Sequence, residues 1–184
     1  SDETAFGPVR NPIDPSRSAG GSSGGSAASI VEGMCFGSVG TDTGGSIRIP
    51  AAACGLVGVK PTLGEIPCDG VVPLSGTLDH VGPLARSVAD AALLFQAMVG
   101  ANVQSVVPAA GTLTLGVPRP YFFDRLEAET RACLEQALGR VRDAGHELRE
   151  ISIEDAPITP DVYLHICLPE ASCFHAETLG EHAE

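Results

Sequence analysis

Residues 40–48 read GTDTGGSIR, and a second run rich in glycine and serine, GGSSGGS, occupies residues 20–26. Nine of the 22 glycines of the chain fall between Gly20 and Gly45, so backbone freedom is concentrated where these hydroxyl groups are. Glycine is needed where a backbone adopts positive φ or where a ligand approaches the backbone closely. A serine beside such a turn is a candidate nucleophile, and nearby N–H groups that have no intramolecular acceptor are candidate oxyanion donors.

A flexible linker is the competing interpretation of these two runs. It fits residues 20–26 when they are taken alone, because they contain only glycine and serine. It fits residues 40–48 poorly, because Asp42, Ile47 and Arg48 interrupt the run and an apolar stretch follows directly. The second run therefore indicates an ordered turn that carries chemistry.

Several ordered pieces of the sequence resemble the amidase signature family of serine hydrolases. Besides the two runs, these pieces are NP at residues 11–12, DPSR at 14–17, CGLVGVKPT at 54–62 and DHVGPLAR at 79–86. The resemblance is strong over residues 11–100 and looser over residues 101–184. It implies an α/β fold with a mixed sheet flanked by helices, of which residues 1–184 would form part of one amidase signature domain.

This resemblance implies a Ser–Ser–Lys catalytic triad that cleaves amides through an acyl-enzyme. By its motifs Ser46 is the nucleophile, and Ser22 is the bridging serine that follows a cis peptide bond. A serine hydroxyl is a weak nucleophile and needs a base within hydrogen-bond reach. A lysine acts as that base only when its amine is kept neutral, so a second serine between the two can relay the proton.

The turn before Ile47 is expected to bind the oxyanion of the tetrahedral intermediate. Its donors are the N–H groups of Thr43, Gly44, Gly45 and Ser46, and the resemblance places the family's oxyanion hole at these positions. Three further residues of the two runs are expected to support the site rather than react: Ser23 through a turn hydrogen bond, and Asp42 and Arg48 by pairing with each other or with the turn.

The lysine departs from the family pattern. Lys60 is the only lysine of the chain, and its motif GVKPT follows the nucleophile in the family and does not supply the base. The family's catalytic lysine lies well upstream of the paired serines, whereas 21 residues precede Ser22 here. We therefore expect an internal piece of a member, with N-terminal and C-terminal portions of the family domain absent, that is inactive on its own.

Two other interpretations of the chemistry stay open. His80 beside Asp79 permits a Ser-His-Asp arrangement with Ser46 as nucleophile. The family also contains amidotransferase A-type subunits, which act on mischarged tRNA with partner subunits and commonly carry glutamine after the Ser-Ile-Arg triplet. Here Ile49 and Pro50 stand at that place, which favours the hydrolase. A degenerate, inactive piece is the non-enzymatic alternative.

Length and composition agree with a globular piece of protein, and the charge disfavours nucleic acid or an anionic membrane as a partner. The net charge is −12, with 14 acidic and five basic residues from Asp124 to Glu184, which disfavours polyanionic partners. No apolar run reaches transmembrane length. The six cysteines show no CxxC pair, which favours buried free thiols in a reducing cytoplasm. We expect a cytoplasmic protein without cofactor or metal, acting on a small-molecule amide, with a homodimer as one option.

Patterning predicts alternating helices and strands. Helices are expected over residues 26–34, 88–99 (opened by a capping box at 87–90), 126–144 and 161–179, the last broken or kinked near Pro169. Strands are expected over residues 35–41, 56–59, 113–117 and 148–153. Residues 65–78 read as a loop that borders a substrate pocket, and residues 101–111 as a connector.

Overall fold

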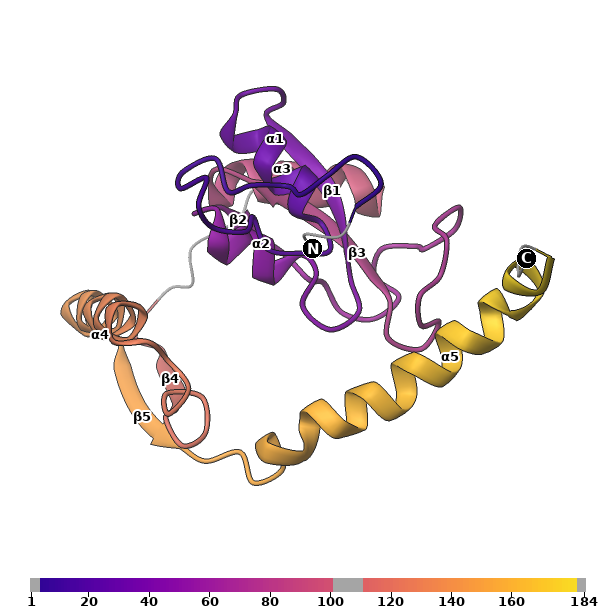
Figure 1. Ribbon diagram of the computed structural model, residues 1–184. Helices are drawn as coiled ribbons and strands as arrows, with labels where there is room; N and C mark the ends of the chain where they lie inside the picture. Colours follow the sequence, from indigo (N-terminus) through magenta and orange to yellow (C-terminus); the bar gives the residue numbers. More distant parts are fainter. Residues whose placement is uncertain (1–3, 101–110, 182–184) are drawn as a thin grey trace. The chain divides into compact units, whose positions relative to one another are not determined.

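The computed structural model describes residues 4–100 and 111–181, and the chain divides into two compact units (Figure 1). The first unit comprises Ser1–Val106 and Leu164–Glu184, and the second comprises Val107–Tyr163. The first contains a three-stranded antiparallel sheet and the second a two-stranded parallel sheet, each accompanied by helices. The α/β class expected from the sequence is confirmed. The connector predicted over 101–111 lies outside the described residues, apart from Gly111.

The sheet of the first unit has the strand order β1-β3-β2. Its strands are β1 (Gly37–Asp42), β2 (Val57–Gly58) and β3 (His80–Ala85), with Asp42 opposite His80. The sequence predicted β1 and β2 but not the central strand β3. Pro83 lacks an N–H and normally argues against a central strand, yet its carbonyl accepts a hydrogen bond from the N–H of Val59 at 3.0 Å.

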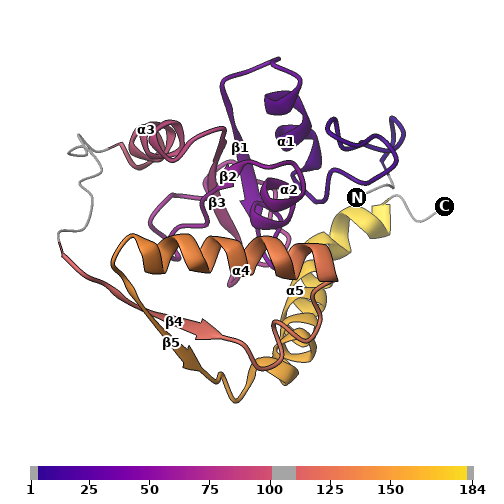
Figure 2. The ribbon, with the colours of Figure 1, turned by 90° about the vertical axis from the view of Figure 1, so that its left-hand side faces the viewer.

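Helices cover both faces of this sheet. These are α1 (Gly24–Val31) and α2 (Arg48–Ala53) on one side and α3 (Val88–Val99) on the other (Figure 2). Strand β1 shows why: a Cβ at Gly37 would meet Leu94 of α3, whereas a Cβ at Gly40 would meet Ile47 beside α2. Positions three apart on a strand face opposite sides, so the two glycines mark the two packed faces.

The core of the first unit lies beneath both glycine-rich runs. It is formed by Ile30 of α1, Ile47, Leu84 of β3 and four smaller side chains, Ala19, Ala27, Ala51 and Cys54. Ile30, Ile47 and Leu84 are fully buried, and burial of each such side chain contributes about 1.5–3 kcal/mol to stability. Ala19 precedes the first run and Ile47 ends the second, so one core anchors both.

Helix α3 begins at the capping box that the sequence predicted. The hydroxyl of Ser87 accepts a hydrogen bond from the N–H of Asp90 at 3.1 Å. We expect Ser87→Ala to lower the free energy of unfolding by about 1 kcal/mol, because the cap acceptor is lost. Urea titration measures this change, and Ser87→Thr, which keeps a hydroxyl, should recover most of it. Equal losses in the two variants would contradict the capping role.

The second unit consists of β4 (Thr114–Pro118), α4 (Ala128–Asp143) and β5 (Glu147–Ile151), with β4 parallel to β5. These elements match the predicted helix and strands within about two residues. Arg119 joins them: it forms ion pairs with Glu135 of α4 and, at 3.6 Å, with Glu150 of β5. Its guanidinium also lies 4.8 Å from the ring centroid of the buried Phe123.

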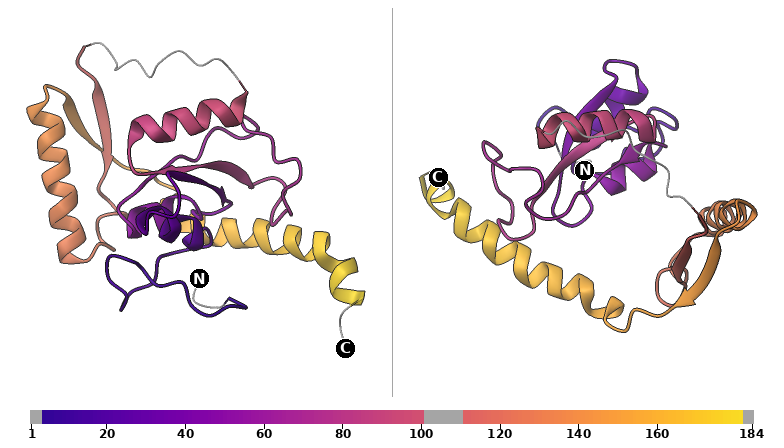
Figure 3. Two further views of the ribbon diagram at one scale, coloured as in Figure 1. Left: turned by 90° about the horizontal axis from the view of Figure 1, so that it is seen from above. Right: turned by 180° about the vertical axis from the view of Figure 1, so that it is seen from behind.

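Helix α5 (Thr159–Glu181) runs without interruption through Pro169 (Figure 3). The helix is therefore not broken at Pro169, so this form of the prediction is wrong. A proline inside a helix costs one hydrogen bond and about 3 kcal/mol, and contacts of the neighbouring Glu170 with another segment hold the helix beyond it. No helix in the described part of the chain is both long enough and apolar enough to cross a bilayer.

Candidate active site

Ser46 lies in the tight turn that connects β1 to α2, and its side chain is half-buried. The turn requires glycine at position 45, where φ is 137°. A Cβ there would also approach the Cδ1 atom of Ile49 to 2.7 Å. The next residue, Ile47, is fully buried in the core. Ser46 is thus held between a glycine that no other residue replaces without strain and a core side chain.

Asp42 organises this turn from the end of β1. Its carboxylate is fully buried and accepts hydrogen bonds from the N–H of Gly45 at 2.7 Å and from the N–H groups of Ile47 and Arg48 at 3.3 and 3.4 Å. The Arg48 guanidinium binds both carboxylate oxygens at 2.9 Å. The pairing of Asp42 with Arg48 that the sequence predicted is present, and it satisfies a charge that would otherwise be costly to bury.

These contacts determine the charge state of Asp42. Burial opposes its negative charge, but the hydrogen bonds and positive charge of Arg48, with the N–H groups of Ile47 and Arg48, outweigh it. The pKa of the Asp42 carboxyl therefore lies below its ordinary value of 3.8. Because the folded pKa is the lower one, ionised Asp42 stabilises the fold above the ordinary pKa, and that stability is lost as the pH falls through the folded pKa.

We therefore expect Asp42→Asn to lower the free energy of unfolding by about 1–3 kcal/mol at pH 7. One buried carboxylate oxygen, which accepts hydrogen bonds, becomes an amide NH2 group that faces other donors and cannot accept from them. The difference from the wild type should narrow below pH 3.8. Thermal unfolding of both proteins between pH 7 and 3 measures it. Asp14→Asn, at the exposed Asp14–Arg17 pair, is the matched control and should change stability far less. A stability difference between the wild type and Asp42→Asn that does not change with pH would contradict the stabilising role of the ionised Asp42 carboxylate.

The two glycine-rich runs meet in space. The N–H of Ser23 donates a hydrogen bond to the carbonyl of Ser46 at 3.2 Å. The peptide bond between Gly21 and Ser22 is cis, as the sequence predicted. The Ser23 hydroxyl accepts from the N–H of Thr41 at 3.1 Å and lies 3.3 Å from the Thr41 carbonyl. Ser23 thus joins the first run to β1, across the chain rather than within its own turn.

The four N–H groups predicted as oxyanion donors differ in whether they already donate to an acceptor in the structure. The N–H of Gly45 is occupied, because it donates to Asp42. Those of Thr43, Gly44 and Ser46 have no acceptor among residues 4–100 and 111–181. Three N–H groups of one turn thus lack an acceptor within these residues, and donors of this kind are what the oxyanion of a tetrahedral intermediate needs.

The hydroxyls of Ser22 and Ser46 likewise have no hydrogen-bond partner in the described part of the chain, and Ser22 is exposed. Lys60 does not supply one: its amine donates to the carbonyl of Pro61 at 2.7 Å. It lines a cavity of about 350 Å³ together with Val57, Glu65 and residues of α3. Neither candidate serine lines that cavity, which agrees with the sequence argument that Lys60 is not the base.

The Ser-His-Asp alternative lacks the bond that would orient its histidine. Asp79 uses one carboxylate oxygen for the hydroxyl of Thr43 and the other for the N–H groups of Leu74 and Ser75. The Nδ1 atom of His80 lies 2.7 Å from the carbonyl of Leu78 instead. A base of this kind needs the carboxylate on its own ring, so the geometry disfavours this alternative.

Known proteins resemble this chain in sequence and in fold. The amidase family model matches residues 1–183. The chain belongs to the amidase family. A solved amidase structure superimposes on 99% of the chain with a TM-score of 0.88 at 41% identity, and the chain covers 42% of it. The A-type subunit of the Thermotoga maritima glutamyl-tRNA(Gln) amidotransferase superimposes on 92% of the chain with a TM-score of 0.82 at 34% identity, and the chain covers 40% of it.

Among curated proteins, the A-type subunit of the glutamyl-tRNA(Gln) amidotransferase of Trichlorobacter lovleyi is 41% identical over 185 residues, covering 93% of this chain and 38% of that protein. The corresponding protein of Roseiflexus sp. is 41% identical over 186 residues, again covering 38% of its length. The chain thus spans about two-fifths of the length of the amidase-family relatives it matches.

Sequence reasoning missed the attachment of the loop at residues 73–77 to α5. Glu170 accepts hydrogen bonds from the hydroxyl of Ser75 at 2.5 Å and from that of Thr77 at 2.6 Å. The Nε2 atom of His175 lies 3.0 Å from the carbonyl of Pro73. Partners that lie 93–102 residues apart leave no spacing pattern in the sequence.

Proposed function

We propose that this chain contributes the nucleophile Ser46 and the relay serine Ser22 to an amidohydrolase that converts a carboxylic or urea-like amide into an acid and ammonia or an amine. The observation that carries the proposal is the meeting of the two runs, because the N–H of Ser23 donates a hydrogen bond to the carbonyl of Ser46. The three N–H groups of the Ser46 turn that lack an acceptor in the described residues support it, since acyl transfer needs such donors for the oxyanion.

The proposed reaction runs through an acyl-enzyme. The Ser46 oxygen attacks the amide carbonyl while its proton passes to Ser22, whose own proton moves to a base. The tetrahedral oxyanion binds the N–H groups of Thr43, Gly44 and Ser46. The C–N bond then breaks, the leaving nitrogen receives a proton through Ser22, and water releases the acid by the reverse path. The base is proposed to be a lysine in sequence upstream of residue 1.

A second candidate is the A-type subunit of an amidotransferase, because the curated relatives quoted above carry that name at 41% identity. Such a protein would generate ammonia from an amide donor and act with partner subunits and a tRNA. The chemistry at Ser46 is the same in both candidates. The two candidates differ in whether the ammonia is released or passed on to a tRNA-bound acceptor. Ile49 with Pro50 after the Ser-Ile-Arg triplet favours the hydrolase.

The test is ammonia release by the full-length protein that contains this chain, measured alone on simple aryl and aliphatic amides and then on glutamine with glutamyl-tRNA(Gln). Turnover of simple amides by the protein alone supports the hydrolase. Ammonia release that requires tRNA and partner subunits overturns it in favour of the second candidate. Residues 1–184 assayed beside the full-length protein should show only residual activity, since Ser46 then has no lysine base; equal activity would refute the upstream base.

A further inference from the structure

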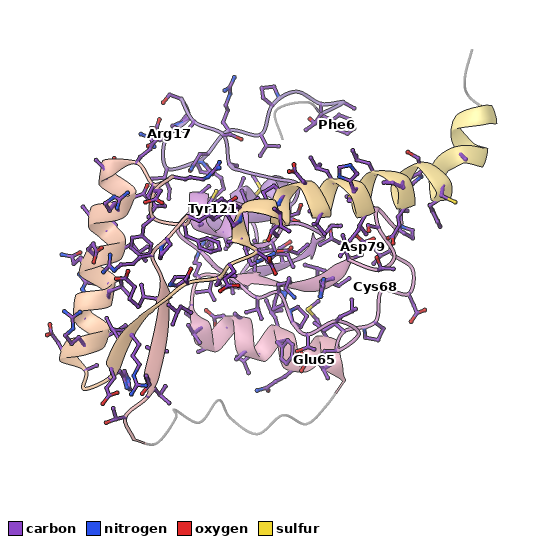
Figure 4. The ribbon with its side chains drawn as sticks, turned by 90° about the horizontal axis from the view of Figure 1, so that it is seen from below. Phe6, Arg17, Glu65, Cys68, Asp79 and Tyr121 are labelled. Carbon is purple, nitrogen blue, oxygen red and sulfur yellow. The ribbon has the colours of Figure 1, made fainter. Side chains whose placement is uncertain are left out.

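We propose that Asp79 is a positioning residue for the Ser46 turn and that it acts through the hydroxyl of Thr43. The inference rests on the function proposed above, and it assigns a part of the machinery that lies outside both glycine-rich runs. Asp79 immediately precedes β3, 36 residues after Thr43 (Figure 4).

The bond between the two side chains fixes the start of the turn. The Thr43 hydroxyl donates to an Asp79 carboxylate oxygen at 2.5 Å, a length typical of a strong, charge-assisted O–H···O⁻ bond. Threonine is branched at Cβ and has few χ1 options, so a fixed hydroxyl also fixes its backbone. The N–H of Thr43 is one of the three open donors, and Asp79 therefore orients a proposed oxyanion donor without touching substrate.

The turn is held at two points by two carboxylates. Asp42 binds the N–H groups of Gly45, Ile47 and Arg48, while Asp79 binds the hydroxyl of Thr43. The open N–H groups of Gly44 and Ser46 lie between and beside these anchors. At the Thr43 end, where β1 ends with Asp42 opposite His80, the second carboxylate adds the only side-chain hydrogen bond to Thr43 that the described residues make.

Asp79 is itself held firmly enough to serve as an anchor. Its second oxygen accepts from the N–H groups of Leu74 and Ser75 at 2.8 and 3.0 Å, and its own N–H donates to the Ser75 carbonyl at 2.8 Å. Ser75 is fully buried and its hydroxyl is bound by Glu170 of α5. A continuous series of hydrogen bonds thus runs from α5 through Ser75 and Asp79 to Thr43.

The test compares Thr43→Val with Thr43→Ser in the full-length protein. Valine keeps the shape of threonine and leaves the bonds of Asp79 to its loop intact, so the fold should survive. We expect Thr43→Val to lower kcat about 10–100-fold with KM changed less than about threefold, because a displaced donor weakens only transition-state binding. The rate at which a fluorophosphonate labels Ser46 should fall in parallel, and Thr43→Ser should recover most of both losses.

Thr114→Val is the matched control, because the Thr114 hydroxyl also donates to a carboxylate, that of Glu147 at 3.2 Å, but in the second unit. It should leave kcat within about twofold of the wild type. Asp79→Asn is the second variant: its amide can still join Thr43 to the loop, and a loss of about 3–10-fold is expected, since the bond becomes neutral.

The inference is overturned if Thr43→Val keeps kcat and the labelling rate within twofold of the wild type. It is also overturned if Thr43→Ser loses as much as valine, since the hydroxyl would then be irrelevant. A wild-type protein that is not labelled at Ser46 refutes the proposed function, and the positioning role with it. Labelling of Ser46 at equal rates in all variants refutes only the positioning role.

Discussion

Ser46→Ala is expected to abolish amide hydrolysis and covalent labelling by a fluorophosphonate in the full-length protein. In the proposed reaction the acyl-enzyme forms on the Ser46 oxygen, and alanine has no atom that can replace it. We expect kcat to fall by at least about 10⁴-fold, the range seen when a triad nucleophile is removed and only oxyanion donors and binding remain. Peptide mass mapping of the labelled wild type should place the adduct on the peptide that contains residues 40–48.

The fold should tolerate this substitution. Ser46 is only half-buried, and its described contact with the first run is made by its carbonyl, which alanine retains. The thermal midpoint is therefore expected to stay within a few degrees of the wild type. Ser172→Ala, an exposed serine on α5, is the matched control and should label and turn over normally. Labelling that persists in Ser46→Ala would remove Ser46 as the nucleophile.

The parts of the site that the sequence predicted are those encoded locally. Asp42 and Arg48 lie six residues apart around one turn, and the Arg48 guanidinium neutralises the buried carboxylate that accepts the N–H groups of that turn. The cis bond at Ser22 was predicted from the motif of the first run and is present. In such segments the chain itself fixes which atoms meet, so motif and geometry agree.

The parts that the sequence did not predict depend on contacts between distant segments. The bonds of Asp79 to Thr43 and of Glu170 to Ser75 join residues 36 and 95 positions apart, and neither has a periodic pattern. Strand β3 was missed for a related reason: pairing with β1 on one edge and β2 on the other stabilises a strand that contains Pro83, although its local propensity is poor.

Helix α5 shows the same limit of local sequence. Local propensity predicts that Pro169 breaks the helix, and the local cost of about 3 kcal/mol is real. The helix continues because residues beyond the proline are attached to the loop at 73–77, by Glu170 to Ser75 and Thr77 and by His175 to Pro73. Tertiary contacts therefore outweigh a strong local signal.

The Gly45 N–H shows that a motif alone does not reveal which donors are free. From sequence, the four N–H groups from Thr43 to Ser46 are equivalent. In the structure Asp42 uses one of them, and the three that remain are those with no acceptor in the described residues. The distinction follows from burial: a fully buried carboxylate must collect donors from its own turn, and Gly45 is the nearest of them at 2.7 Å.

Ser22→Ala is expected to lower kcat about 10²–10⁴-fold, the range for a positioned acid–base group. The residue after Ser22 donates its N–H to the carbonyl of Ser46, so the backbone at Ser22 lies close to the turn of the proposed nucleophile. In the proposed reaction, the proton of Ser46 then has no relay to the base and the leaving nitrogen has no proton donor. Both acylation rate and rate of fluorophosphonate labelling should therefore fall.

The size of the loss must come from chemistry rather than from folding. Ser22 is exposed and makes no hydrogen bond within the described part of the chain, so its removal should barely change the thermal midpoint. Ser26→Ala is the matched control: Ser26 belongs to the same run, but its hydroxyl donates to the carbonyl of Val39 at 2.9 Å, so alanine should affect stability more than turnover. Near-normal kcat in Ser22→Ala together with an inactive Ser46→Ala would mean that Ser46 passes its proton directly to the base. Ser22 would then have a structural role in the turn and no role in proton transfer.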